Sequence, residues 1–133
     1  QHSKQFEDLL LRSEVMIQPF LRALEVEGEY SLMYFGKEYS HTVLKQAKSG
    51  DFRVQDKFGG TIEAVTPSAE MLAAGEKVLN VLRGEPLYAR VDLVMDKGRP
   101  LLGEIELIEP HLYFGYDKKA AEKFVEIYEK LAK

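Results

Sequence analysis

The fold is decided by residues 88–110, which read YARVDLVMDKGRPLLGEIELIEP. In this stretch, two runs of alternating apolar and charged residues flank a short polar segment that contains Gly98. Alternation with a period of two is typical of strands that bury one face, and glycine suits the turn of a hairpin. The stretch therefore predicts antiparallel strands over residues 87–94 and 101–108, joined by a loop over residues 96–100.

This hairpin also predicts which residues lie opposite one another. Counting outward from Gly98 places Asp92 opposite Glu104. The same count places Arg90 opposite Glu106, so all four charged side chains share one face. The other face then carries an apolar set for packing against helices, interrupted by the small Gly103: Val91, Leu93, Ile105 and Leu107.

The charged face predicts a site for a metal ion and a nucleotide. Directly opposed carboxylates have Cβ atoms about 4.5–5.5 Å apart and repel one another, so Asp92 and Glu104 need compensation. A hard divalent cation supplies it, since Mg²⁺ prefers carboxylate oxygens and completes its shell with water and substrate phosphates. Arg90 beside that cation is shaped to hold a phosphate through two parallel hydrogen bonds.

A second interpretation of the same face is an ion pair on a solvated sheet. Arg90 then pairs with Glu106, while Asp92 and Glu104 stay in water or share that salt bridge. Alternating charge on a solvent-facing strand is common, so the pattern alone leaves both interpretations open.

The other strands are predicted from apolar and β-branched runs. Residues 15–21 form an apolar run typical of a buried strand. After a turn at Gly28, residues 30–35 and 39–44 form a second hairpin. The polar, glycine-bearing segment 45–60 has no clean period and is predicted to be a loop.

Three helices are predicted from apolar stripes with helical spacing. The first carries Phe6, Leu9 and Leu10. The second is capped by Thr66, has Pro67 at its first position and stops at Gly84. The last is capped by Asp117. Its inward face is expected to be Ala121, Phe124, Val125, Tyr128 and Leu131. Strands and helices together predict a single α+β domain over residues 1–133, with an antiparallel sheet packed against helices.

Composition narrows the classes of function. With 45% hydrophobic and 30% charged residues, the 133-residue chain has the composition of a globular protein. The formal charge of −4 argues against nucleic acid as a partner, and no apolar run is long enough to span a membrane. The absence of cysteine excludes disulfides, thiolate metal sites and a cysteine nucleophile, and it suits the cytoplasm, where we expect the protein.

The charged strands resemble a known family. Arg90-Val-Asp92 followed by Glu104-Ile-Glu106 resembles the metal-binding end of ATP-grasp ligases, whose usual pattern is Asp and then Glu-x-Asn. Upstream, residues 45–60 are similar to the basic, glycine-bounded loop of bacterial glutathione synthetases and ribosomal-protein glutamate ligases. Residues 15–21 resemble the strand between two lobes against which adenine lies. Residues 28–31 resemble the turn whose acidic residue meets the ribose.

The resemblance implies a role for each matched residue. It implies that Mg²⁺, with Mn²⁺ as an alternative, is held by Asp92, Glu104 and Glu106. It implies that phosphates are neutralised by Lys45, Arg53 and Arg90, of which Arg53 and Arg90 also act in catalysis. Adenosine would be contacted by Gln18, Leu21 and Glu29. Two positions depart from the family pattern, because Glu106 and Gln55 stand where asparagine is usual.

The resemblance also implies a function. It indicates the Mg-ATP-binding part of a carboxylate–amine ligase that works through an acyl phosphate on small-molecule or peptide substrates. The match covers the C-terminal lobe, so an N-terminal lobe and a further domain are expected before residue 1, and the isolated chain is expected to be inactive. The alternative is a non-catalytic binding or scaffold domain with the same fold. A homo-oligomer is left open.

Overall fold

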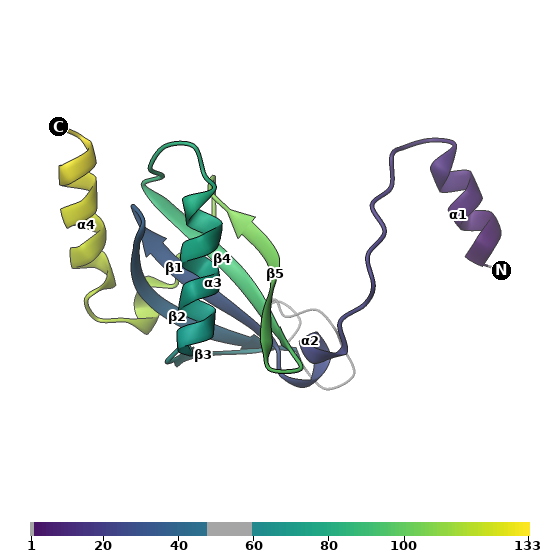
Figure 1. The fold of residues 1–133 in the computed structure, drawn as a ribbon, viewed down its shortest axis with the longest axis horizontal. Coiled ribbons are helices and arrows are strands. Elements are labelled where there is room, and N and C mark those ends of the chain that lie inside the picture. Colours follow the sequence, from purple (N-terminus) through teal and green to yellow (C-terminus); the bar gives the residue numbers. More distant parts are fainter. Residues whose placement is uncertain (1, 48–59) are drawn as a thin grey trace.

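The computed structural model describes residues 2–47 and 60–133, which form a five-stranded antiparallel sheet with helices (Figure 1). The strands lie in the order β3-β2-β1-β4-β5. Their bounds are β1 Glu29–Phe35, β2 Glu38–Gln46, β3 Thr61–Val65, β4 Tyr88–Asp96 and β5 Arg99–Glu106. The helices are α1 His2–Leu10, α2 Arg22–Val26, α3 Ala69–Asn80 and α4 Ala120–Leu131, with a 3₁₀ turn η2 at Phe114–Tyr116. The predicted α+β fold class is confirmed.

The hairpin of β1 and β2 follows a glycine turn, as predicted. Gly28 has a φ of +97°, and a side chain there would overlap the backbone carbonyl of Lys45. Only glycine tolerates both the left-handed backbone and this close approach. The turn starts β1 so that Glu29 lies opposite Lys45 on β2.

The hairpin of β4 and β5 has the predicted register at its charged end and a different turn. Arg90 lies opposite Glu106, and Asp92 lies opposite Glu104, as predicted. The expected loop over residues 96–100 is wrong, because the strands continue to a tight turn at Lys97-Gly98, where both φ angles are positive. Such a turn matches the twist of the paired strands. A β-bulge at Gly103 then restores the register.

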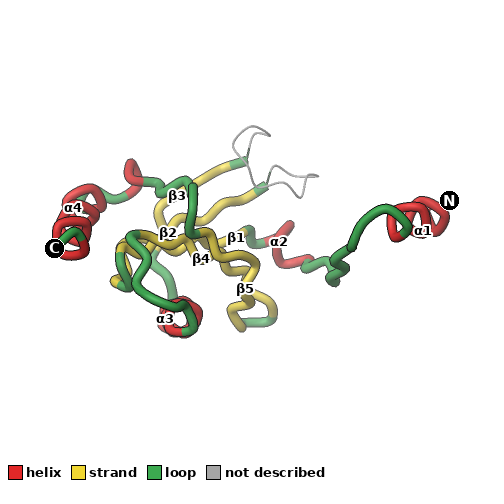
Figure 2. The backbone as a smooth tube through the Cα atoms, turned by 90° about the horizontal axis from the view of Figure 1, so that it is seen from above, coloured by secondary structure: helices red, strands yellow, loops and turns green. Residues whose placement is uncertain are grey.

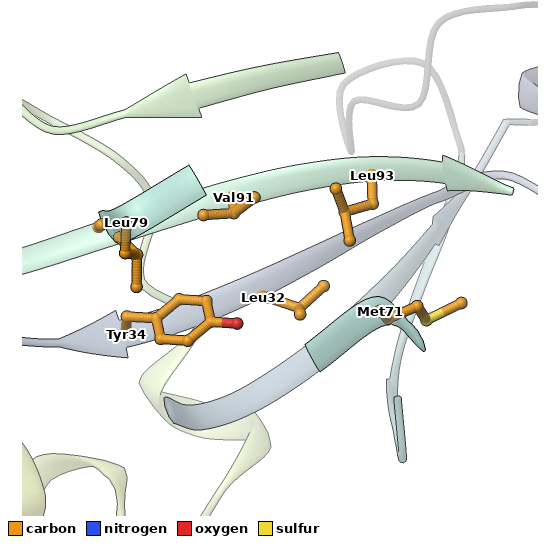
Figure 3. Close-up of a cluster of buried hydrophobic side chains, with 7 residues drawn as sticks. Leu32, Tyr34, Met71, Leu79, Val91 and Leu93 are labelled. Atoms are coloured by element: carbon orange, nitrogen blue, oxygen red, sulfur yellow. The ribbon is translucent and has the colours of Figure 1, made fainter. Parts of the chain in front are cut away.

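The core lies on both faces of the sheet. On one face, α3 packs against alternate residues of β1 and β4, and Figure 3 shows this cluster: Leu32, Tyr34, Met71, Leu79, Val91 and Leu93. On the other face, the chain after β5 and helix α4 cover a smaller set: Met33, Phe35, Val43, Tyr113, Ala120 and Ile127. Figure 2 shows α3 on one side of the sheet. The end of the second face near Glu29 carries polar side chains.

Helix α3 starts later than predicted. Its N-cap is Ser68, whose hydroxyl accepts a hydrogen bond from the Met71 N–H at 3.3 Å, and neither Thr66 nor Pro67 belongs to the helix. Serine is an equally good cap, and the apolar stripe does not choose between Thr66 and Ser68. The helix ends at Asn80, before Gly84.

Helix α4 is rotated relative to the prediction. Its buried residues are Ala120 and Ile127, with Phe124 half-buried. The other residues expected to face inward are exposed: Ala121, Val125, Tyr128 and Leu131. Asp117 is not the N-cap, although its carboxylate accepts a hydrogen bond from the Lys119 N–H at 2.8 Å. The helix has two apolar stripes, and the one that begins at Ala120 contacts the sheet.

The predicted strand over residues 15–21 is wrong. This segment is unpaired within the described residues, and three of its apolar side chains are exposed, namely Met16 at 88%, Ile17 at 72% and Phe20 at 56%. A strand needs the backbone of a neighbour, and no described strand lies beside it. The predicted first helix is confirmed as α1, which stands away from the sheet (Figure 1). None of the described helices has the length and apolarity to cross a membrane.

His41 ties the segment that follows β5 to the sheet. The imidazole is 5% exposed, its Nε2 lies 3.1 Å from the Leu112 carbonyl oxygen, and its Nδ1 lies 2.9 Å from the Ser40 hydroxyl. A neutral ring satisfies both, since Nε2 donates to the carbonyl while Nδ1 accepts from the hydroxyl. Burial lowers the pKa of His41 below its usual value, although the Leu112 carbonyl opposes the shift.

We expect this buried imidazole to make stability depend on pH below about 6.5. At higher pH, His41 is neutral in both the folded and the unfolded state. As the pH falls, the unfolded state gains the proton first, so the free energy of unfolding decreases. The destabilisation caused by His41→Gln, measured by urea denaturation, should therefore be about 1 kcal/mol smaller at pH 5.5 than at pH 7.5. His111→Gln, at an exposed histidine, is the control, and a pH-independent effect of His41→Gln would contradict the prediction.

Candidate functional site

Charged side chains from four strands meet on the sheet face that α3 does not cover. They come from alternate positions at one end of the sheet: Glu29 on β1, Lys45 on β2, Arg90 and Asp92 on β4, and Glu106 on β5. The register explains the meeting, because Ser31 on β1 is the cross-strand partner of Asp92 and Arg90 is that of Glu106. We call these five charged residues and Ser31 the ionic cluster.

Asp92 lies at the centre of the ionic cluster and is 1% exposed. Its carboxylate accepts hydrogen bonds from Arg90 Nε at 3.0 Å to Oδ1 and from Arg90 Nη2 at 2.9 Å to Oδ2. Oδ1 also accepts a hydrogen bond from the Ser31 hydroxyl at 2.6 Å. A buried carboxylate is stable only when it is paired and hydrogen-bonded, and here both conditions are met.

Lys45 lies between the carboxylates of Glu29 and Asp92. It is 6% exposed, forms an ion pair with Glu29, and places Nζ 3.6 Å from Asp92 Oδ2. Burial raises the pKa of Glu29, and the charge of Lys45 opposes this shift. The lysine was predicted to open a loop at residue 45, but it belongs to β2, and this strand position is what buries it.

A pocket of about 380 Å³ adjoins the ionic cluster. Four predicted site residues line it, three from the N-terminal part of the chain and one from β5: Gln18, Leu21, Glu29 and Glu104. The rest of the lining is mainly apolar: Pro19, Phe20, Leu24, Val94 and Gly103. An apolar pocket with a few polar groups at its edge is the usual form of a small-molecule site. Glu29 belongs both to the pocket and to the ionic cluster, so the two form one candidate site.

The predicted site residues therefore lie in two adjoining groups. Lys45, Arg90, Asp92 and Glu106 lie in the ionic cluster, and Gln18, Leu21 and Glu104 line the pocket. Arg53 and Gln55 lie outside the described residues. Sequence reasoning missed Ser31. The pairing of β1 with β4 that brings it to Asp92 joins strands that are not consecutive in the chain.

Of the three carboxylates predicted to bind a metal ion, Asp92 and Glu104 are cross-strand partners, whereas Glu106 pairs with Arg90. Glu106 Oε2 lies 2.6 Å from Arg90 Nη2, which is the ion pair of the second interpretation. Within residues 2–47 and 60–133, no three acidic, histidine or cysteine side chains are placed to hold a metal ion. Asp92 and Glu104 are cross-strand partners, and Glu104 is exposed on the pocket wall. Two carboxylates suit Mg²⁺, which takes its other ligands from water and phosphates.

The chain is similar in sequence and structure to a known synthetase and, in structure, to a known ligase. No family model matches the chain. It is 29% identical over 126 residues to cycloserine biosynthesis protein DcsG of Streptomyces lavendulae, covering 86% of this chain and 41% of that protein. The crystal structure of D-cycloserine synthetase DcsG matches with a TM-score of 0.70 and 26% identity, over 87% of this chain and 42% of that chain. A D-alanine–D-alanine ligase from Bacillus anthracis matches with a TM-score of 0.53 and 18% identity, over 97% and 46%.

These similar proteins are ATP-grasp ligases, and the likeness supports the ATP-grasp superfamily. It does not support glutathione synthetases or ribosomal-protein glutamate ligases as the nearest relatives. At 18% identity, the D-alanine–D-alanine ligase supports the fold alone. The chain spans about two fifths of the length of the curated relative that it matches.

Proposed function

We propose that this chain is the Mg-ATP-binding part of an ATP-dependent carboxylate–amine ligase. In the proposed reaction, the terminal phosphoryl group of ATP is transferred to a carboxylate with release of ADP, and an amine then attacks the acyl phosphate to form an amide with release of phosphate. The observation that carries the proposal is the apolar pocket beside a buried ionic cluster, with Glu29 common to both. Small-molecule or peptide substrates, a cytoplasmic location and an N-terminal lobe that completes the site belong to the same proposal.

The pocket suits the nucleoside. Phe20, Leu21 and Leu24 provide an apolar wall against which a flat base can lie. Gln18 offers an amide that both donates and accepts hydrogen bonds at that wall. Glu29 at the junction with the ionic cluster would accept hydrogen bonds from ribose hydroxyls.

Two members of the ionic cluster would face the phosphates. Lys45 and Arg90 carry the positive charge, and preorganised cations stabilise the charge that develops on a transferred phosphoryl group. Glu106 holds Arg90 from β5 and fixes the direction of its guanidinium. No side-chain nucleophile is required, which agrees with the absence of cysteine.

Asp92 and Glu104 would hold Mg²⁺, or Mn²⁺ in its place, at the boundary between pocket and cluster. When bound, the cation neutralises phosphate charge and orients the phosphate oxygens. In this proposal, Glu106 is committed to Arg90. Asp92 keeps its place through Arg90 and Ser31, and Glu104 approaches from the exposed side of the hairpin.

A non-catalytic domain is the second candidate, and one observation favours it. The carboxylate of Asp92 is already engaged by Arg90 through both oxygens. A scaffold that has lost its chemistry would keep such a pair for stability alone, and Glu104 would then have no function. The two candidates make opposite predictions for Glu104.

We expect Glu104→Gln to weaken Mg²⁺-dependent binding of a non-hydrolysable ATP analogue by at least about tenfold. Calorimetry on the full natural polypeptide that carries this sequence measures the effect. Because Glu104 is exposed, the substitution should leave the fold intact. Glu109→Gln, at an exposed glutamate outside the pocket lining, is the matched control. Equal affinity of wild type and Glu104→Gln would favour the scaffold, as would the absence of metal-dependent binding in the wild type.

A further inference from the structure

Ser31 holds a position that is unusual for a polar residue. It is 0% exposed, and its hydroxyl lies 2.6 Å from Asp92 Oδ1. A hydrogen bond to a buried, charged acceptor is among the stronger ones in proteins, and 2.6 Å is the separation expected for such a bond. Ser31 and Asp92 are direct cross-strand partners on β1 and β4, so the bond follows from the sheet register.

Ser31 and Arg90 hold Asp92 from different strands of the sheet. Arg90 lies on the same strand, two residues before Asp92, and contacts both carboxylate oxygens from that side. Their pairing orients the two side chains relative to each other. Ser31 contributes a hydrogen bond from β1 and thereby fixes the rotation of the carboxylate relative to the neighbouring strand.

Ser31 also differs from the other cluster residues in charge. Lys45 and Arg90 neutralise Asp92 as they approach it, which reduces the attraction of its carboxylate for a cation. A neutral hydroxyl orients the carboxylate without that cost. The hydroxyl therefore adds direction to the carboxylate beyond what the two cations supply, and it removes no further negative charge.

We infer that Ser31 is a positioning residue, which holds Asp92 in the orientation that binds a divalent cation together with a nucleotide. The inference rests on the proposed function and adds to it a role for a residue to which the resemblance assigns none. Because Ser31 is 0% exposed, it would make no direct contact with the phosphates or the cation. It acts through Asp92 alone.

The test is the Mg²⁺ dependence of nucleotide binding in three variants of the full natural polypeptide. Calorimetry with a non-hydrolysable ATP analogue gives the Mg²⁺ concentration for half-maximal binding. Ser31→Ala is expected to raise it about tenfold, because one hydrogen bond to a charged group is lost. Ser31→Thr keeps the hydroxyl and should restore it to within about threefold of wild type. Ser40→Ala is the control, since that hydroxyl contacts His41 and not Asp92.

The readout separates positioning from stability. Thermal unfolding without Mg²⁺ measures the structural contribution of Ser31, whereas the Mg²⁺ dependence measures its effect through Asp92. If Ser31→Ala does not fold, Ser31→Cys, which keeps the size but donates weakly, should show the same shift. A wild-type Mg²⁺ dependence in the alanine or the cysteine variant would overturn the positioning role alone. Absence of Mg²⁺-dependent binding in the wild type would overturn the proposed function, and the positioning role with it.

Discussion

Replacing Arg90 by Met is expected to lower the free energy of unfolding by about 3–5 kcal/mol, as when one partner of a buried ion pair is removed. Asp92 is 1% exposed, and Arg90 supplies three of its hydrogen bonds. Among the described residues, the carboxylate without the guanidinium keeps Ser31 and the more distant Lys45 as partners. Glu106 loses its partner as well. Methionine keeps most of the aliphatic length, so the loss reports the charge and its hydrogen bonds.

Two further variants make this expectation specific. Arg99→Met removes an exposed arginine from the start of β5 and should change stability by less than about 0.5 kcal/mol. Adding Asp92→Asn to Arg90→Met removes the carboxylate charge that has lost its partner. The double variant should therefore recover part of the lost free energy of unfolding, because the effects of contacting residues are not additive. Urea denaturation measures all three. A loss below about 1 kcal/mol for Arg90→Met would place the cluster among ordinary surface ion pairs.

The charged end of the β4–β5 hairpin could be predicted because local pattern decides it. Alternation fixes which residues share a face, and Gly98 marks the turn. The loop over 96–100 was nevertheless wrong. A tighter turn shifts the pairing by one residue, and the bulge at Gly103 shifts it back before Asp92 and Glu104. The sequence shows the glycine, but it does not reveal that a bulge is required there.

The errors in helix α4 and in residues 15–21 have one physical origin. Periodicity reports that a segment has an apolar side, but not which element covers it. Helix α4 has two such sides, and its contact with Phe35 on the sheet chooses the one with Ala120 and Ile127. Residues 15–21 are apolar enough for a strand, but pairing depends on a neighbouring backbone and not on composition.

The candidate site was predicted where it depends on local motifs and missed where it depends on strand order. Asp92, Glu104 and Arg90 follow from one hairpin. Ser31 and the buried position of Lys45 depend on β1 lying between β2 and β4, which no local pattern encodes. The strand β3 was missed although β-branched residues occur in it, because its five residues are too few to establish a period.

Replacing Gly75 by Ala should lower the free energy of unfolding by about 3 kcal/mol, in the upper range for overpacking. Gly75 lies within α3, where alanine would normally stabilise the helix by about 1 kcal/mol. A Cβ at this position would overlap the Tyr34 hydroxyl and lie 2.9 Å from its Cζ. Tyr34 is 0% exposed and packed between the sheet and α3, so its ring cannot move aside (Figure 3). A decrease in stability would therefore indicate that the clash with Tyr34 dominates, and an increase would indicate that helix propensity dominates.

The prediction for Gly75→Ala can also be tested in combination with a substitution that removes the Tyr34 hydroxyl. Among the described residues it is buried without a hydrogen-bond partner, and burial raises the pKa of Tyr34 above its usual value. Tyr34→Phe should therefore be neutral or stabilising by up to about 1 kcal/mol, since it removes an unsatisfied polar group. Combined with Gly75→Ala, it should recover about half of the loss, because the ring carbons still crowd the new methyl group.

Chemical denaturation of the two single variants and the double variant gives their coupling energy. Lys77→Ala, at an exposed position of the same helix, is the control and should change stability by less than about 0.5 kcal/mol. If Gly75→Ala stabilises the protein, α3 does not approach β1 as closely as described. If the single effects simply add, the hydroxyl is not what obstructs the methyl group. The close packing of Gly75 on Tyr34 thus links the glycine in α3 to the strand that also carries Glu29 and Ser31.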